Sequence, residues 1–232
     1  MTQHIGIVAC SFEGAALCYR TICLEAAKAL GAHAHPEVSL HNHQLLDYLP
    51  PLDAGDTKAV ADLMLSSAHK LARAGADFLI CPDNTIHQAM SHVLPRSPLP
   101  WLHIADVVAE EAKRRGFKRI GITGTAWLVN SDVYPEAFDK HGLQWMRPET
   151  PERDEIARII MEELVRGVQS PEAVAYFQRV MARMQADGCD AVVLGCTEIP
   201  LIMHDGNSPL PTLDSTALLA QAAVRRAVQG HT

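Results

Sequence analysis

Apolar runs of strand length alternate along the chain with longer segments of helical periodicity. The expected strands lie at 5–10, 36–41, 77–82, 100–104, 118–123 and 190–195. The expected helices lie at about 13–31, 57–75, 86–93, 105–116, 131–142, 151–167, 171–188 and 214–228. Because the strand-length runs are continuously apolar rather than alternating, we expect parallel strands that are buried on both faces. The sequence therefore predicts an α/β fold.

Two pairs of segments repeat at a nearly constant spacing. The pairs are Gly75–Ile86 with Gly188–Ile199, at an offset of 113 residues, and Ile5–Ser11 with Ile120–Ala126, at an offset of 115. Within the longer pair, Asp83 falls opposite Cys196. The repeat predicts two similar lobes that each present one acid/base group from the same structural place. Proton transfer on both faces of one carbon requires this layout.

The repeat also predicts where the lobes divide. We expect the first lobe at 1–104 and the second at 105–204, with the last stretch, about 205–232, returning to the first lobe through a helix. The proline-rich piece Pro95–Pro100 suits a crossing between the lobes, because proline stiffens a linker and ends the preceding helix.

Bulk composition narrows the choice of partner and compartment. A formal net charge of −7 argues against nucleic acid as a main partner, because binding phosphates requires a basic face. No apolar stretch approaches the ~18 residues of a membrane span, and the start of the chain lacks the pattern of a signal peptide. The six cysteines include no CxxC pair, which favours free thiols in a reducing compartment. We therefore expect a cytoplasmic protein with a small-molecule partner and no membrane contact.

Small or polar residues follow four of the expected strands. These segments are Ala9–Ser11, Asp83–Thr85, Gly124–Thr125 and Cys196–Glu198. Ligands of open parallel sheets bind beyond the carboxyl ends of the strands, where backbone N–H groups can hold a carboxylate without a cationic side chain. The chain has neither a GxxxxGK[ST] nor a GxGxxG motif, so nucleotide binding is not expected.

Two residues at these strand ends have both a chemical and a structural interpretation. Cys196 precedes an expected helix start, which would favour its thiolate, but a buried core cysteine is the alternative. Asp83 is well placed to cap a helix, and the repeat adds an acid/base role.

His87, four residues after Asp83, could tune an acid pair or be satisfied by hydrogen bonds in the core. The pairs His33/His35 and His41/His43 lack a third ligand at useful spacing, so no metal site is expected.

The segments Asp83–Thr85 and Leu194–Pro200 resemble motifs of the aspartate/glutamate racemase family, the cofactor-independent amino-acid racemases. The likeness continues through IGI near the start, LHIAD at 102–106, RIGITGT at 119–125, Ser131 with Tyr134, EELVRG at 162–167, and Pro211 with LDST at 213–216. The resemblance implies two pseudo-symmetric α/β lobes of parallel sheet with the active site in the cleft between them. It also implies one cysteine from each lobe, no pyridoxal phosphate or metal, and commonly a homodimer.

The resemblance carries over to individual residues. Cys196 matches the family's second catalytic cysteine, whereas Asp83 stands where the first cysteine is usual. The predicted substrate-binding residues are Ser11, Asn84, Thr85, Thr125, Arg166 and Thr197, with Arg166 suited to a distal carboxylate. The loop from His41 to Thr57 has no Arg or Lys, although some aspartate racemases use a cation there.

An Asp/Cys pair has a preferred resting state. Because an ordinary thiol has a pKa of about 8.5 and an ordinary aspartate a pKa of about 3.9, we expect Asp83 to be ionised and Cys196 protonated. Asp83 is then the natural base and Cys196 the natural acid for one direction, while the reverse direction needs the disfavoured protonation states. We therefore predict a racemase of aspartate or glutamate with unequal kinetics in its two directions.

Three other functions stay open. A one-cysteine decarboxylase of the same superfamily would use Cys196 as its proton donor, but Asp83 would repel the departing carboxylate. A non-catalytic relative would bind acidic amino acids without turnover. A cysteine hydrolase based on Cys196 is the weakest alternative, because no His with an orienting partner is identifiable near that residue.

Overall fold

The computed structural model describes residues 2–229 and divides the chain into two compact units. The first unit comprises Met1–Val107 and Thr216–Thr232, and the second comprises Val108–Ser215. Residue 1 and residues 230–232, which the predicted first lobe includes, lie outside the described residues. No helix within 2–229 is long and apolar enough to cross a membrane.

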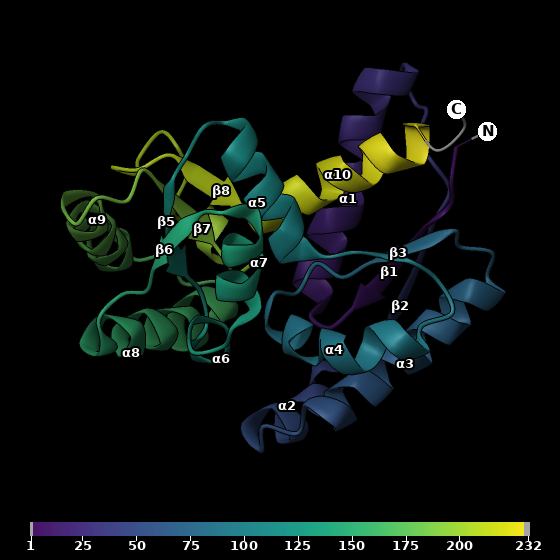
Figure 1. Cartoon of the computed structure of the whole chain (residues 1–232), viewed down its shortest axis with the longest axis horizontal. Helices are drawn as coiled ribbons and strands as arrows, with labels where there is room; N and C mark the ends of the chain where they lie inside the picture. The colour runs from purple at the N-terminus through teal and green to yellow at the C-terminus, as the bar shows by residue number, and fades with distance from the viewer. Residues whose placement is uncertain (1, 230–232) are drawn as a thin grey trace. The chain divides into compact units, whose positions relative to one another are not determined.

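The first unit is built around a four-stranded parallel sheet with the order β2-β1-β3-β4 (Figure 1). Its strands are β1 (Ile5–Ala9), β2 (Val38–Asn42), β3 (Phe78–Ile80) and β4 (Trp101–Leu102). Its helices are α1 (Phe12–Leu30), α2 (Leu45–Asp53), α3 (Thr57–Arg73), α4 (Met90–Val93) and α10 (Ser215–Gln229), which starts at the last residue of the second unit. The strands β1 and β3 are buried along their whole length, as their continuous apolar sequences predict.

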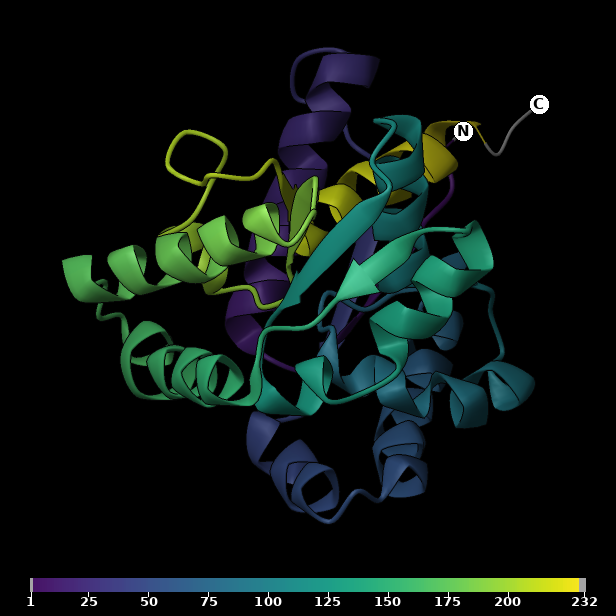
Figure 2. The same cartoon turned by 60° about the vertical axis from the view of Figure 1, so that its left-hand side comes forward.

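Helices cover both faces of this sheet. A core cluster that includes Val8, Leu79 and Met64 packs α3 onto the sheet. The helices α10 and α1 lie side by side in both views of the fold (Figures 1 and 2). The end of α10 is fixed by a hydrogen bond from Gln3 N to Ala227 O of 2.9 Å. Packing on both faces explains why the strands carry no polar alternation.

The second unit repeats the topology of the first, with a parallel sheet of order β6-β5-β7-β8. Its strands are β5 (Arg119–Thr123), β6 (Gln144–Met146), β7 (Ala191–Leu194) and β8 (Thr212–Asp214). Its helices are α6 (Ala126–Val129), α7 (Val133–His141), α8 (Thr150–Arg158) and α9 (Pro171–Ala186), and α5 (Ile104–Arg114) spans the boundary between the units. The predicted α/β class is confirmed, and the repeated segments hold equivalent places: β1 matches β5, and β3 matches β7.

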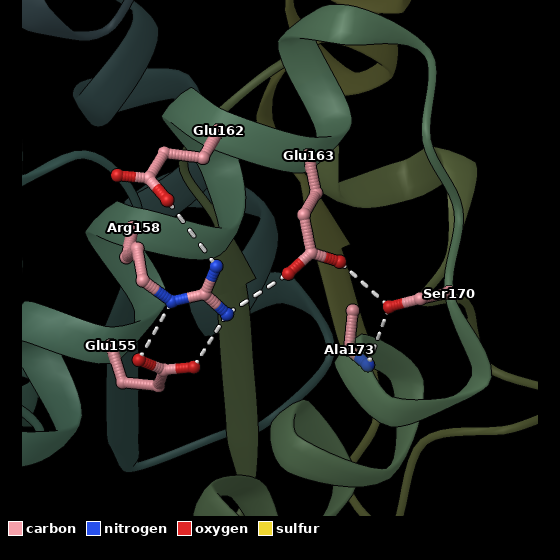
Figure 3. A network of polar contacts seen from close by, with 6 residues as sticks. All are labelled: Glu155, Arg158, Glu162, Glu163, Ser170 and Ala173. Carbon is pink, nitrogen blue, oxygen red and sulfur yellow. Dashed lines mark hydrogen bonds and ion pairs between the residues drawn. The ribbon is translucent and has the colours of Figure 1, made fainter.

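The single helix predicted at 151–167 is wrong in its second half. The α-helix α8 ends at Arg158, a π-helical turn follows at Ile159–Glu163, and a 3₁₀ turn at Leu164–Arg166 ends at Gly167. Figure 3 shows the guanidinium group of Arg158 bound to the carboxylates of Glu155, Glu162 and Glu163. Glu163 also accepts a hydrogen bond of 2.7 Å from Ser170 Oγ, and Ser170 caps α9. This network ties the widened turn to both neighbouring helices.

Candidate functional site

The first unit places Ser11 and Asp83 just beyond the carboxyl ends of two adjacent strands, β1 and β3. Ser11 Oγ accepts a hydrogen bond of 3.2 Å from Gly14 N and so caps α1. Asp83 Oδ1 accepts one of 3.1 Å from Ile86 N. The local structure after Asp83 is a 3₁₀ turn, Thr85–Ala89, rather than the expected α-helix. The carboxylate of Asp83 thus binds a backbone N–H of this turn, although the N-cap position of the turn is Asn84.

The next two predicted residues share this strand end with Asp83. Asn84 is buried, with 3% of its surface exposed, and Thr85 is half-buried at the start of the 3₁₀ turn. Asp83 itself is half-buried. The structure thus brings Ser11, Asp83, Asn84 and Thr85 to the same edge of one sheet, where the chain offers carboxylate, amide and hydroxyl groups.

Cys10 is a neighbour of Asp83 that the sequence interpretation did not assign. Its thiol lies close enough to Asp83 to be affected by the charge of that residue. The Cys10 side chain is only 2% exposed, and its burial, with the nearby Asp83 charge, raises the pKa of the thiol far above its usual value. The thiol therefore stays protonated. The signal in the sequence was the position of Cys10 at the end of an expected strand.

His87 fixes the main chain of Asp83 rather than its carboxylate. Its Nδ1 donates to Asp83 O at 2.6 Å, and its Nε2 accepts from Ile104 N at 3.4 Å. Burial lowers the pKa of His87 well below the usual range, and the neighbouring His103 ring lowers it further. His87 is thus a neutral, core-satisfied histidine that joins the Asp83 segment to the start of α5.

In the second unit, two glycines let the ends of β5 and β7 approach closely. Gly195 N donates to Thr123 O at 3.0 Å, and a Cβ added at Gly195 would lie 2.5 Å from that oxygen. A Cβ at Gly124 would lie 3.1 Å from Gly195 O. The adjacent Thr125 is 9% exposed and caps the short helix α6, accepting from Leu128 N at 3.3 Å. Only glycine allows this spacing of the two strand ends.

Cys196 is half-buried beyond β7, and its thiol donates to Glu198 Oε2 at 2.9 Å. Thr197 Oγ1 donates to the same oxygen at 2.8 Å. The helix start predicted after Cys196 is wrong, because the chain makes only a turn and the three-residue 3₁₀ segment Ile199–Leu201. A helix terminus therefore does not explain the chemistry of this thiol. Its partner is Glu198, whose place two residues after Cys196 was visible in the sequence.

Two cationic side chains, Arg166 and Lys70, bear on how a substrate's distal carboxylate could be held. Arg166 is exposed in the 3₁₀ turn that follows the network of Figure 3, on a segment separate from β5 and β7. In the first unit, Lys70 Nζ on α3 donates to His41 Nε2 at 2.8 Å. A cationic side chain therefore lies against the start of the loop from His41 to Thr57, although that loop itself contains no Arg or Lys. His41 Nδ1 bonds Ser67 Oγ at 2.9 Å. Within residues 2–229, no three or more His, Cys, Asp or Glu side chains gather as a metal site.

Comparisons with known proteins match this arrangement along most of the chain. The sequence model of the Asp/Glu/Hydantoin racemase family matches residues 7–223. The broad specificity amino-acid racemase RacX of Bacillus subtilis (strain 168) is 23% identical over 177 residues, covering 75% of this chain and 74% of that protein. A Yersinia pestis structure provisionally assigned as an Asp/Glu racemase is 30% identical, with a TM-score of 0.91 over 98% of this chain and 100% of that one. The structure of an aspartate racemase homologue from Pyrococcus horikoshii OT3 is 25% identical, with a TM-score of 0.84 over 99% of this chain and 100% of that one.

Proposed function

The chain belongs to the Asp/Glu/Hydantoin racemase family, and we propose that it racemises an acidic amino acid, aspartate or glutamate, by two-base transfer of the α-proton. Relatives with named activities are amino-acid racemases, which makes the protein an isomerase. The observation that carries the mechanism is the equivalence of Asp83 and Cys196, each of which follows the same strand of its own sheet. Each also has a neighbour of the other chemical type: the Cys10 thiol lies near Asp83, and the Glu198 carboxylate accepts from Cys196.

In the proposed reaction, the Asp83 carboxylate removes the α-proton as the Cα–H bond breaks, and the electron pair moves into the substrate's carboxylate. Cys196 then gives its thiol proton to the opposite face of Cα and is left as thiolate. The hydrogen bond from the Cys196 thiol to Glu198 supports this resting state, because a carboxylate acceptor favours the protonated thiol. The reverse reaction starts from protonated Asp83 and ionised Cys196.

The remaining predicted residues would hold the substrate. Asn84, Thr85, Thr125 and Thr197, with Ser11, offer amide and hydroxyl groups at the strand ends for the α-carboxylate and α-ammonium groups. Arg166, on its exposed turn, is the proposed partner of the distal carboxylate. The relatives named as Asp/Glu or aspartate racemases favour an acidic substrate, while the Bacillus relative is named for broad specificity.

The primary test is α-proton exchange in D₂O, followed by proton NMR on separate L- and D-forms of aspartate and glutamate. We expect loss of the α-proton signal with the wild-type protein, and a decrease of about a thousandfold or more in Cys196→Ser. Cys189→Ser is the matched control, because Cys189 is a second thiol of the same unit that is buried, with 4% exposure, and that precedes β7 rather than following it as Cys196 does. We expect this variant to keep wild-type exchange.

Three results would contradict the proposal. Exchange that survives Cys196→Ser unchanged would remove Cys196 from the reaction. Binding of aspartate or glutamate without exchange would indicate a non-catalytic binding protein, and release of carbon dioxide from a substituted malonate would indicate a decarboxylase. We also propose a cytoplasmic homodimer, which light scattering on the purified protein and cell fractionation would test.

A further inference from the structure

Helix α1 carries apolar side chains on two faces, and one of these faces stays open to solvent. The buried residues of the helix are Gly14, Ala15, Cys18, Ile22 and Ala26. Phe12, Tyr19 and Leu24 lie outside this buried stripe and are 70%, 43% and 51% exposed. A surface helix of a single chain normally turns charged and polar residues to the water. The second apolar face of α1 therefore suits a partner that residues 2–229 do not supply.

The exposed face has the spacing of a helix that pairs with another helix. Its apolar residues Phe12, Ala16, Tyr19 and Cys23, called here the α1 stripe, follow one another at intervals of four, three and four residues. This alternation keeps one apolar stripe turned towards a second helix along its length. Large and small side chains also alternate along the stripe, because an aromatic residue precedes Ala16 and another precedes Cys23. A matching surface therefore has its small residues where this one has its large ones.

The charged side chains of α1 indicate which surface matches the stripe. Glu25 and Lys28 form an ion pair with each other at 2.7 Å. Glu13 and Arg20 are exposed beside the stripe, and neither forms an ion pair with another of residues 2–229. When two α1 helices lie antiparallel, Glu13 of each copy faces Arg20 of the other. In a parallel pair the like charges would meet instead, so the charges favour the antiparallel arrangement.

We propose that the α1 stripe is an interface with a second copy of this chain, in which two α1 helices pack antiparallel across a two-fold axis. This inference rests on the homodimer of the proposed function and not on the racemase activity. The antiparallel register sets Phe12 against Cys23 of the second copy and Tyr19 against Ala16, so each aromatic ring meets a small side chain. A two-fold axis makes every contact occur twice, including the contact between Glu13 and Arg20. The stripe is thus complementary to itself in both size and charge.

The first test is sedimentation velocity of the purified full-length chain at rising concentration. We expect the wild type to dissociate in the micromolar range, because one helix pair makes a small interface. Arg20→Glu sets two negative charges against each other on both sides of the axis and should raise the dissociation constant by about tenfold or more, as should Glu13→Arg. Lys113→Glu is the matched control, because it makes the same change in net charge as Arg20→Glu at an exposed position of α5. This control should dimerise like the wild type.

The second test mixes the two charge-reversed variants. In the mixture, a Glu13→Arg chain and an Arg20→Glu chain present opposite charges at both contacts. We therefore expect heterodimers with nearly the wild-type dissociation constant, while each variant alone dimerises weakly. The double variant Glu13→Arg/Arg20→Glu restores both contacts within one chain and should also dimerise like the wild type. This recovery distinguishes a broken charge pair from a helix that no longer folds.

A wild-type dimer that neither charge reversal weakens would overturn the assignment of the α1 stripe, as would a mixture that associates no more tightly than its components. A wild-type chain that stays monomeric at its highest soluble concentration would overturn the interface and the proposed homodimer together, and a different kind of molecule would then have to cover Phe12 and Tyr19. Absence of α-proton exchange in a wild-type dimer that charge reversal weakens would contradict the racemase activity alone. The failures are therefore distinguishable.

Discussion

The two units present the same pair of chemical groups, with the proposed reacting position held by a different member in each. At the end of β3 that position holds the carboxylate of Asp83, and the Cys10 thiol lies near it. At the end of β7 that position holds the thiol of Cys196, and a carboxylate accepts from it. The repeat thus preserves the place of the reacting group, while its chemical identity has changed.

The two neighbours come from different segments of the chain. Cys10 comes from the adjacent strand end, a position that Thr125 occupies in the second unit, whereas Glu198 comes from the same turn as Cys196. The carboxylate of Glu198 accepts from the thiol of Cys196 and favours its protonated form. In the proposed reaction, this contact favours the direction of proton transfer in which Cys196 is the acid.

The largest expected effect comes from making the reacting groups alike. The two enantiomers have equal free energies, so kcat/KM for net inversion must be the same in both directions, but α-proton exchange without inversion need not be. We expect Asp83→Cys to bring the exchange rates of the two enantiomers closer to each other by about a hundredfold, because two thiols have similar pKa values. Exchange of each enantiomer in D₂O at one pH measures the ratio.

Asp83→Glu is the control for that substitution, since it keeps a carboxylate and should keep the imbalance. A ratio that is the same in Asp83→Cys and the wild type would show that the imbalance does not originate in the Asp/Cys pair.

The next effect concerns how closely neighbouring strands approach each other within each unit. Gly195→Ala would place a Cβ 2.5 Å from the main-chain oxygen of Thr123, which cannot move without displacing β5. We expect this substitution to lower the free energy of unfolding by about 2 kcal/mol. Gly6→Ala in the first unit is the comparison, because its nearest neighbour is the end of the Leu79 side chain, at 2.6 Å. Denaturant unfolding of both variants gives the measurement, and an equal loss would contradict the difference between a rigid and a yielding neighbour.

A smaller effect is expected from the partner of Cys196. Glu198→Gln replaces a charged acceptor with a neutral amide and makes the thiolate easier to form. We expect exchange of the slower enantiomer, which needs that thiolate, to rise about tenfold, with little change for the faster one. Separate exchange rates for the two enantiomers test this. A fall in both rates together would instead mean that Glu198 relays the proton of Cys196.

Sequence patterns predicted the features that depend on local periodicity. The buried strands β1, β3, β5 and β7 are continuous apolar runs, and the repeat located Asp83 and Cys196 at equivalent strand ends. The short strands β6 and β8 went unpredicted, because each mixes polar with apolar residues and neither lies in a continuous apolar run. The helix α2 contains Pro50 and Pro51, which disfavour a helix locally, yet Tyr48 anchors it through complete burial.

The candidate site was predictable only in part, because its contacts depend on strand pairing and on turn geometry rather than on local periodicity. Cys10 and Asp83 are far apart in the chain, and their proximity depends on which strands are neighbours and in what register. A sequence shows that both residues follow strands but not that those strands pair. The Cys196–Glu198 contact spans two residues, yet it depends on the chain making a turn where a helix start was expected.

Glu111 provides a contrast to both reacting pairs, because its partners are cations rather than a thiol. On α5, its carboxylate accepts from Arg114 at 2.6 and 2.7 Å and from Arg115 at 2.6 Å. The hydrogen bond from Arg114, with the one from Arg115, lowers the pKa of Glu111 to about 2. A depressed pKa contributes stability above the ordinary glutamate pKa, and this stability is lost as the pH falls through the folded value.

We therefore expect Glu111→Gln to lower the free energy of unfolding by about 1 kcal/mol at neutral pH, a value reduced by the exposure of the Arg114 side chain. The difference from the wild type should shrink as the pH falls from about 5 towards 2, and unfolding curves across that range measure it. A loss in Glu111→Gln that kept its full size at low pH would contradict this prediction, because it would show that packing rather than the ion pairs accounts for the change.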